Sequence, residues 1–192
     1  LDFDNLTEEN IYVLDSPILT NSHFKKFKKV FSKKIKIIDC TFDITSSLKD
    51  RIEKIREECE IAVREGSSSL ILSDKEISLS RASIPTILAV GAVHSHLVKL
   101  GLRGYCSINV ESSDALDTHS FAILIGVGAT TVNPYLAIDS IYQRFEKKLF
   151  GESDFETCVL KFKKSIDSGL LKIMSKMGIS VISSYRGGCN FE

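Results

Sequence analysis

Apolar residues along this chain alternate between helical spacing and short continuous runs. In the helical stretches they recur every three or four positions, as expected for amphipathic helices. These stretches cover residues 21–34, 47–66, 85–101, 119–127, 135–150 and 155–177, and we expect the last to break near Gly169. The short runs are typical of buried strands and cover residues 35–42, 68–74, 105–112, 130–134 and 179–182.

About five strand–helix units follow one another through short connections, which predicts an α/β fold. Helical crossovers between strands require the strands to be parallel. Five units are too few for an eight-stranded barrel, so we expect part of a TIM barrel, with an open doubly wound sheet as the alternative. The sequence has no low-complexity linker, which favours a single domain over residues 1–192.

Local signals place several of these boundaries. Ser47 followed by Asp50 is typical of a helix start, and Gly66 marks the end of the same helix. Gly126 and Gly128 follow a helix and precede a strand. This is the reverse of the dinucleotide-binding arrangement, so we interpret these glycines as a helix stop.

Polar residues follow the predicted strands, and parallel strands bring their carboxyl ends together on one edge. An anion or carbonyl site there is one hypothesis, in which Arg186 binds a phosphate or carboxylate. The alternative is that these groups satisfy loop backbones and cap helices. The candidates are Asp74, Glu111, Asn133, Ser184, Tyr185 and Arg186, and Asp39 and Ser112 occupy similar positions.

Composition excludes several classes of function. Lys plus Arg and Asp plus Glu each number 25, and a chain without net positive charge is a poor nucleic-acid binder. No apolar run reaches the length of about 20 residues that spans a membrane. The five cysteines are scattered without a C-x-x-C pair, which favours free thiols and an intracellular location, cytoplasmic or organellar.

No catalytic or metal-binding motif is recognisable. His94 and His96 are two residues apart on a predicted helix, whereas helical metal pairs are spaced by four, and His119 could join them only through the fold. Lys172 and Lys176 share a face near a helix end, where the helix dipole favours cations. We therefore predict no metal site and no catalytic residue.

Four long segments together resemble one family, the central domain of the glutamate synthase large subunit. The match is close over roughly residues 60–192 and looser before them. The segments are residues 70–77 (LILSDKEI), 84–112 (IPTILAVGAVHSHLVKLGLRGYCSINVES), 118–141 (THSFAILIGVGATTVNPYLAIDSI) and 169–192 (GLLKIMSKMGISVISSYRGGCNFE).

The resemblance implies a multidomain oxidoreductase that converts glutamine and 2-oxoglutarate into two molecules of glutamate. In that family an amidotransferase domain releases ammonia, and a domain with FMN and an iron–sulfur cluster reduces the imine with electrons from NAD(P)H or ferredoxin. The central domain, related in topology to the FMN domain, links the two and helps to wall an ammonia tunnel. Its partners would be those two domains and, in some enzymes, a small electron-donating subunit.

This chain begins at Leu1, and we expect it to be an excised piece of such an enzyme, inactive alone and without its own cofactor. It differs from the family pattern at Lys75, Ser95 and Ser120, which puts chemistry at these positions in doubt. An independent FMN- or phosphate-binding barrel oxidoreductase is the alternative, with Arg186 at the phosphate. A self-contained interaction module is the third hypothesis.

Overall fold

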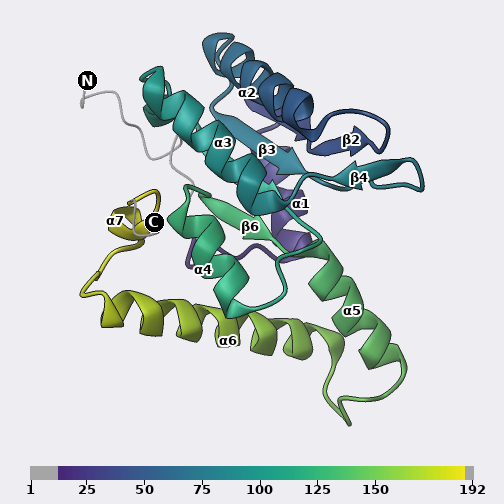
Figure 1. Cartoon of the computed structure of the whole chain (residues 1–192). Coiled ribbons are helices and arrows are strands. Elements are labelled where there is room, and N and C mark those ends of the chain that lie inside the picture. The colour runs from purple at the N-terminus through teal and green to yellow at the C-terminus, as the bar shows by residue number, and fades with distance from the viewer. Residues whose placement is uncertain (1–12, 189–192) are drawn as a thin grey trace.

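A parallel β-sheet forms the centre of the molecule, and the computed structural model describes residues 13–188 (Figure 1). Its strands lie in the order of the chain, and all three neighbouring pairs are parallel. They are β1 (Ile35–Asp39), β3 (Ser69–Ser73), β5 (Ser107–Glu111) and β6 (Thr131–Asn133). Ile18 forms a parallel bridge to Val132 and extends the sheet beyond β6. The predicted parallel sheet with helical crossovers is confirmed.

Helices cover both faces of this sheet. One face carries the crossover helices α2 (Leu48–Arg64), α3 (Thr86–Lys99) and α4 (Thr118–Gly126), whereas α1 (Asn21–Val30) lies on the other (Figure 1). The sequential strand order is that of a TIM barrel. The second covered face is a feature of the alternative, an open doubly wound sheet.

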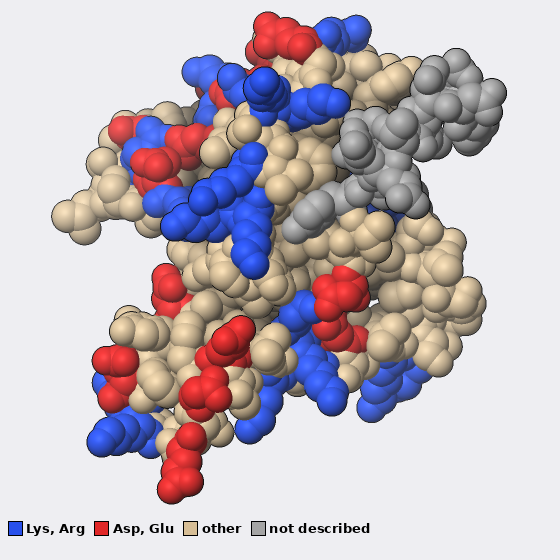
Figure 2. All heavy atoms as spheres, turned by 180° about the vertical axis from the view of Figure 1, so that it is seen from behind, with Lys and Arg blue, Asp and Glu red and all other residues tan. Residues whose placement is uncertain are grey.

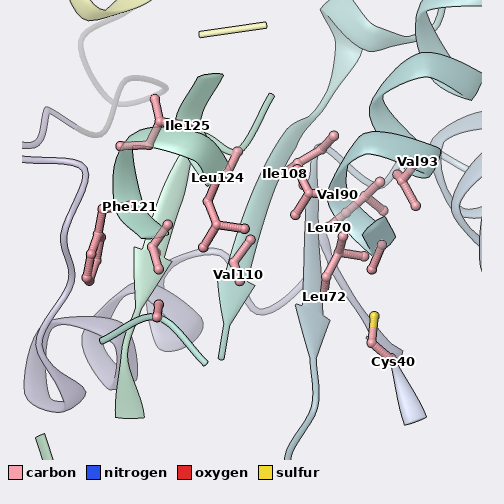
Figure 3. Packing of buried hydrophobic residues seen from close by; sticks show 14 of the residues in the cluster. Cys40, Leu70, Leu72, Val90, Val93, Ile108, Val110, Phe121, Leu124 and Ile125 are labelled. Carbon is pink, nitrogen blue, oxygen red and sulfur yellow. The ribbon is translucent and has the colours of Figure 1, made fainter. Parts of the chain in front are cut away.

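The larger part of the core lies between the sheet and its crossover helices. Side chains of β3 and β5 point toward α3 and α4, where Leu70, Val90 and Val110 are fully buried (Figure 3). On the opposite face Ile71 packs against Phe24 and Phe27 of α1. Because successive strand residues point to opposite faces, β3 contributes to both sides and is buried along its whole length.

Two further helices extend the fold beyond the sheet. They are α5 (Tyr135–Glu146) and α6 (Phe155–Lys176), and α6 packs across α4 and α5 (Figure 1). Tyr142 and Phe155 meet edge to face, with ring centroids 5.3 Å apart. Two more short helical turns are present, η3 (Arg103–Tyr105) and α7 (Ile182–Tyr185).

The predicted helix boundaries at residues 47 and 66 are confirmed. The hydroxyl group of Ser47 accepts a hydrogen bond from the backbone of Asp50 at 3.3 Å, and Gly66 adopts a φ of +94°. Helix α4 ends at Gly126, and Gly128 follows with a φ of +125°. These glycines therefore terminate a helix, as their order in the sequence indicated.

Predictions for the strands were wrong in two places. Residues 35–42 are not one strand, because the chain leaves the sheet after Asp39 and forms β2 (Thr41–Asp43). This strand pairs antiparallel with β4 (Arg81–Ser83), a short strand with no clear signal in the sequence. Residues 179–182 form no strand, and Ile182 instead begins α7.

The predicted break of the last long helix at Gly169 was also wrong. Helix α6 continues without interruption from Phe155 to Lys176. Gly169 is used for close packing, since a Cβ atom there would lie 2.4 Å from Cγ2 of Thr118 in α4. A residue that weakens a helix locally is tolerated because it allows two helices to approach.

We predict that Gly169→Ala lowers the free energy of unfolding although alanine favours helices. Overpacking against Thr118 costs about 1–3 kcal/mol. Gly91→Ala in α3 is the matched control, because its new methyl group meets nothing within 4 Å, and it should stabilise the protein by about 0.5–1 kcal/mol. Urea unfolding measures both values, and stabilisation by both changes would contradict the packing role of Gly169.

Candidate functional site at the carboxyl edge of the sheet

One polar residue from each strand lies in a row across the carboxyl edge of the sheet. The parallel register pairs Asp39 with Ser73, Ser73 with Glu111, and Glu111 with Asn133. Paired residues in parallel strands point to the same face, so these four side chains share the face that α1 covers. We call Asp39, Ser73, Glu111 and Asn133 the carboxyl row.

Glu111 is the most heavily bonded member of the carboxyl row. Its residue is 4% exposed, and Oε2 accepts a hydrogen bond from the hydroxyl group of Ser73 at 2.8 Å. Oε1 accepts from Nζ of Lys75 at 2.9 Å and from Nζ of Lys28 at 3.2 Å. Lys28 lies on α1 and Lys75 follows β3, so one carboxylate joins three elements.

The charge of Glu111 is stabilised despite its burial. Burial raises the pKa of the Glu111 carboxyl group, but hydrogen bonds from Lys75 and Ser73 and the charges of both lysines outweigh that effect. The pKa therefore lies below its ordinary value, and Glu111 is ionised at neutral pH. A carboxylate held in this way is a poor general acid or base, because its proton affinity is too low.

Asn133 fixes the other end of α1. Its amide nitrogen donates to the carbonyl oxygen of Leu19 and to Oδ1 of Asn21, both at 2.9 Å. Asn21 is the first residue of α1, and Lys28 lies two turns further along the same helix. The carboxyl row therefore holds α1 at both ends, over the edge where parallel α/β folds place their chemistry.

Asp74 is engaged in the loop after β5. The residue is 2% exposed, and its Oδ2 accepts from the backbone nitrogen of Ser113 at 2.8 Å and from the Ser113 hydroxyl group at 2.6 Å. The hydroxyl group of Tyr135 lies beside both residues, and burial together with the charge of Asp74 raises the pKa of Tyr135. Asp74 thus orders a connection, which was the alternative interpretation of these strand-end residues.

The structure places Ser184, Tyr185 and Arg186 away from the carboxyl row. The buried Tyr185 hydroxyl group donates to the carbonyl oxygen of Ala122 at 3.0 Å, and the Gly187 nitrogen donates to that of Gly126 at 2.9 Å. Gly126 is the last residue of α4, which lies near the amino end of β6. Their predicted position at a strand end was wrong, because the β-branched residues before them have no sheet edge to join.

A histidine contact that the sequence did not reveal lies at this amino edge. Nδ1 of His94 accepts a hydrogen bond from Nε of Arg103 at 3.1 Å, and the imidazole ring packs against Gly128 and Gly187. A Cβ atom at either glycine would lie within 2.6 Å of the ring. Burial and the charges of Arg103 and Arg186 lower the pKa of His94, so the ring is neutral at pH 7.

His96 and the cysteines of residues 13–188 form no metal or nucleophile site. Nε2 of His96 in α3 pairs with Oε2 of Glu60 in α2 at 2.9 Å, on the face of the sheet opposite α1. Within residues 13–188 no group of three or more His, Cys, Asp or Glu side chains is placed to hold a metal ion. The four cysteines in this range are free and buried, and burial raises the pKa of Cys40 to about 12, which makes it a weak nucleophile.

The helices between residues 13 and 188 include none with the length and apolar character needed to cross a bilayer.

On the face that carries α1, Lys and Arg side chains form a group near the centre of the view (Figure 2). Helix α1 carries the exposed Lys25, Lys26 and Lys29, besides Lys28 at the carboxyl row. Acidic side chains are interspersed elsewhere on the same face (Figure 2).

The fold defines an α/β protein related to part of a TIM barrel. Two solved structures share it: dihydroorotate dehydrogenase (DHODH) from Eimeria tenella in complex with ferulenol, and an L230A mutant of flavocytochrome b2 with benzoylformate. The TM-scores are 0.53 and 0.55 at 14% and 16% identity. The matches cover 82% and 87% of this chain but 38% and 37% of those chains, respectively.

The chain belongs to the glutamate synthase central domain family, whose model matches residues 3–192. It is 50% identical over 189 residues to the large chain of NADPH glutamate synthase from Azospirillum brasilense. It is 40% identical to the chloroplastic ferredoxin-dependent glutamate synthase of Spinacia oleracea. The two matches cover 97% and 94% of this chain but 12% of each relative, so the chain spans about one eighth of their length.

We predict that Glu111→Gln lowers the free energy of unfolding at neutral pH by about 1–3 kcal/mol, because two lysines lose their shared anion. The low pKa of Glu111 determines how this stabilisation depends on pH. The contribution of Glu111 to the free energy of unfolding is complete above about pH 4.3, and it is lost as the pH falls through the pKa of Glu111 in the folded protein. Urea unfolding across this range measures the difference between the wild type and the variant.

Glu58→Gln is the matched control for this prediction. Glu58 pairs with Arg51, but its side chain is 41% exposed. An exposed pair contributes at most about 1 kcal/mol. Equal effects of the two substitutions, or a Glu111 effect that does not decline in acid, would contradict the role assigned to the carboxyl row.

We also predict that the protein loses stability when the pH falls from neutral toward pH 5.5, and that His94→Gln reduces this loss. Because the pKa of His94 is lowered in the folded protein, the contribution of the neutral ring to the free energy of unfolding is complete above about pH 6.5. Below that pH it declines by at most about 1.4 kcal/mol per pH unit. Chemical unfolding at each pH measures it. A pH dependence in the His94→Gln protein that equals that of the wild type would contradict this role of His94.

Proposed function

We propose that this chain is the linking part of a glutamate synthase and acts as a scaffold rather than as a catalyst. In this proposal the whole enzyme converts glutamine and 2-oxoglutarate into glutamate, and this part holds the ammonia-releasing and reducing domains in register. The family match over residues 3–192 carries the proposal. Relatives that are 40–50% identical to this chain are glutamate synthases, and the chain corresponds to about 12% of their length.

The geometry of the carboxyl row supports a structural role. Its central carboxylate already has three partners, and α1 lies over the same edge. A catalytic edge in a parallel α/β fold needs loops that leave room for a substrate. Here the corresponding side chains of Glu111 and Asn133 bind a helix of the same chain. The proposed partners are therefore protein domains, an amidotransferase domain and an FMN-containing domain of the same enzyme.

The described residues do not fit a flavin phosphate at this edge. The ionised Glu111 already binds the amino groups of Lys28 and Lys75, so the cations that could bind a phosphate group at this edge are occupied. Arg186, the residue that the alternative oxidoreductase hypothesis required at the phosphate, lies at the opposite edge near Thr130. We therefore place FMN and the iron–sulfur cluster of the enzyme outside this chain, with electrons from a nicotinamide or from ferredoxin, as the names of the relatives indicate.

An FMN titration of the purified chain tests this proposal. Because no described site offers a phosphate-binding loop at the carboxyl row, we expect flavin fluorescence to remain unquenched at protein concentrations well above that of FMN. Apo-flavodoxin, a known FMN binder, serves as the control for active flavin. Stoichiometric quenching by this chain would contradict the scaffold proposal and favour the independent oxidoreductase.

The parent gene provides a second test. We expect an upstream region encoding a glutaminase with an N-terminal cysteine nucleophile, and a downstream region encoding a glycine-rich flavin domain. An intracellular location is part of the same proposal, and it is supported by the free buried thiols and by the chloroplastic relative. A gene that encodes neither neighbouring domain would contradict the assignment.

A further inference from the structure

A cavity at the amino edge of the sheet has no role in the scaffold proposal. Its volume is about 380 Å³, within the range of small-molecule sites, and it lies between α6, α7, the start of β6 and the residues before α1. Much of its wall is apolar. The apolar side chains are Leu14, Pro17, Leu170, Leu171, Met174 and Ile182.

Arg186 contributes a cation to this wall. Within residues 13–188 its guanidinium group forms no ion pair and no hydrogen bond. Its titratable neighbours at the amino edge are Arg103 and the neutral His94, and the positive charge of Arg103 repels it. A half-buried guanidinium group beside a second one is stabilised when an anion binds to it, and its planar donors suit a carboxylate.

The neighbouring cation cannot take this anion itself. Arg103 already donates to the carbonyl oxygens of Cys106 and Gly128, at 2.6 Å and 2.9 Å, and to His94. Its Nη2 also lies 3.5 Å from the hydroxyl oxygen of Thr130, which is part of the cavity wall. Arg186 is therefore the cation with donors left for a ligand.

The acidic residues of the cavity limit the charge of that ligand. Asp167 accepts from the hydroxyl group of Ser16 at 2.6 Å, and Lys163 bonds Asp15 at 2.9 Å and lies 4.0 Å from Asp167. One lysine thus serves two carboxylates, and Arg103 and Arg186 together leave these five groups with one net positive charge. A single carboxylate neutralises that charge, whereas a dianion such as phosphate would exceed it beside Asp15 and Asp167.

We propose that this cavity binds a small monocarboxylate with an apolar body, with the carboxylate group on Arg186 and the apolar part against Leu170 and Met174. Fatty acids and apolar amino acids share this chemistry. In an amino acid the ammonium group would face Asp167. The proposal does not depend on the enzyme to which the chain belongs, and its failure would leave the scaffold role untouched.

Methionine methyl groups provide a direct test, because the chain contains two methionines. Met174 is 5% exposed and lines the cavity, whereas Met177 is 42% exposed and does not line it. In protein labelled with ¹³C at these methyl groups, titration with 4-methylpentanoate should shift the Met174 resonance saturably and leave that of Met177 in place. L-Leucine in the same titration shows whether an ammonium group strengthens binding.

Three controls separate a carboxylate site from unspecific binding. The neutral 4-methylpentanamide and inorganic phosphate should each bind at least about tenfold more weakly than the carboxylate, because a charged hydrogen bond of the guanidinium group is lost or opposed. Arg186→Gln should weaken 4-methylpentanoate by a similar factor. Arg144→Gln, which alters an arginine in a different cavity between α5 and α6, should change nothing.

An unmoved Met174 resonance would overturn the proposal. So would equal affinity for the amide and the carboxylate, or full affinity in the Arg186→Gln protein. The amide comparison uses the wild-type protein, so the proposal stays testable even if the Arg186 variant folds poorly. Phosphate binding stronger than carboxylate binding would also overturn it, in favour of an anion site of another kind.

Discussion

The structure depends on one buried negative charge, the carboxylate of Glu111. A carboxylate at 4% exposure is strongly destabilising unless cations and hydroxyl groups surround it. Ser73 comes from the neighbouring strand, Lys75 from the loop after it, and Lys28 from a helix 83 residues away in sequence. Satisfying this charge therefore requires the sheet and α1 to form together. The same interactions occupy the edge on which other α/β folds carry out chemistry.

Parts of this arrangement could be predicted from the sequence, and the physical reason is clear. Glu111 and Asn133 end apolar runs, and parallel strands necessarily align their ends, so both were expected on one edge. The register confirms that they are neighbours. The partner Lys28 could not be predicted, because lysines at helical spacing usually mark a solvated face and nothing local indicates which side of the sheet a helix covers.

The errors have a common physical cause. Val181 and Ile182 have the β-branched side chains of a strand, but a strand needs a partner edge. The residues after them bind carbonyl oxygens of α4 instead, Tyr185 through its hydroxyl group and Gly187 through its backbone nitrogen. Arg186 was consequently expected at the carboxyl edge and lies at the amino edge. Gly169 was interpreted through helix propensity alone, whereas its contact with Thr118 decides its role. In each case tertiary packing outweighs a correct local preference.

The carboxyl edge of the sheet is thus closed by a helix of its own chain, as the proposed scaffold role requires. Hydrogen exchange of the α1 backbone amides tests this closure most directly. If α1 is held by the carboxyl row, its central amides should exchange as slowly as those of β3 and β5. All three elements would then exchange only through global unfolding. Exchange of α1 that is orders of magnitude faster than that of the strands would show that the helix opens independently, and would contradict the account.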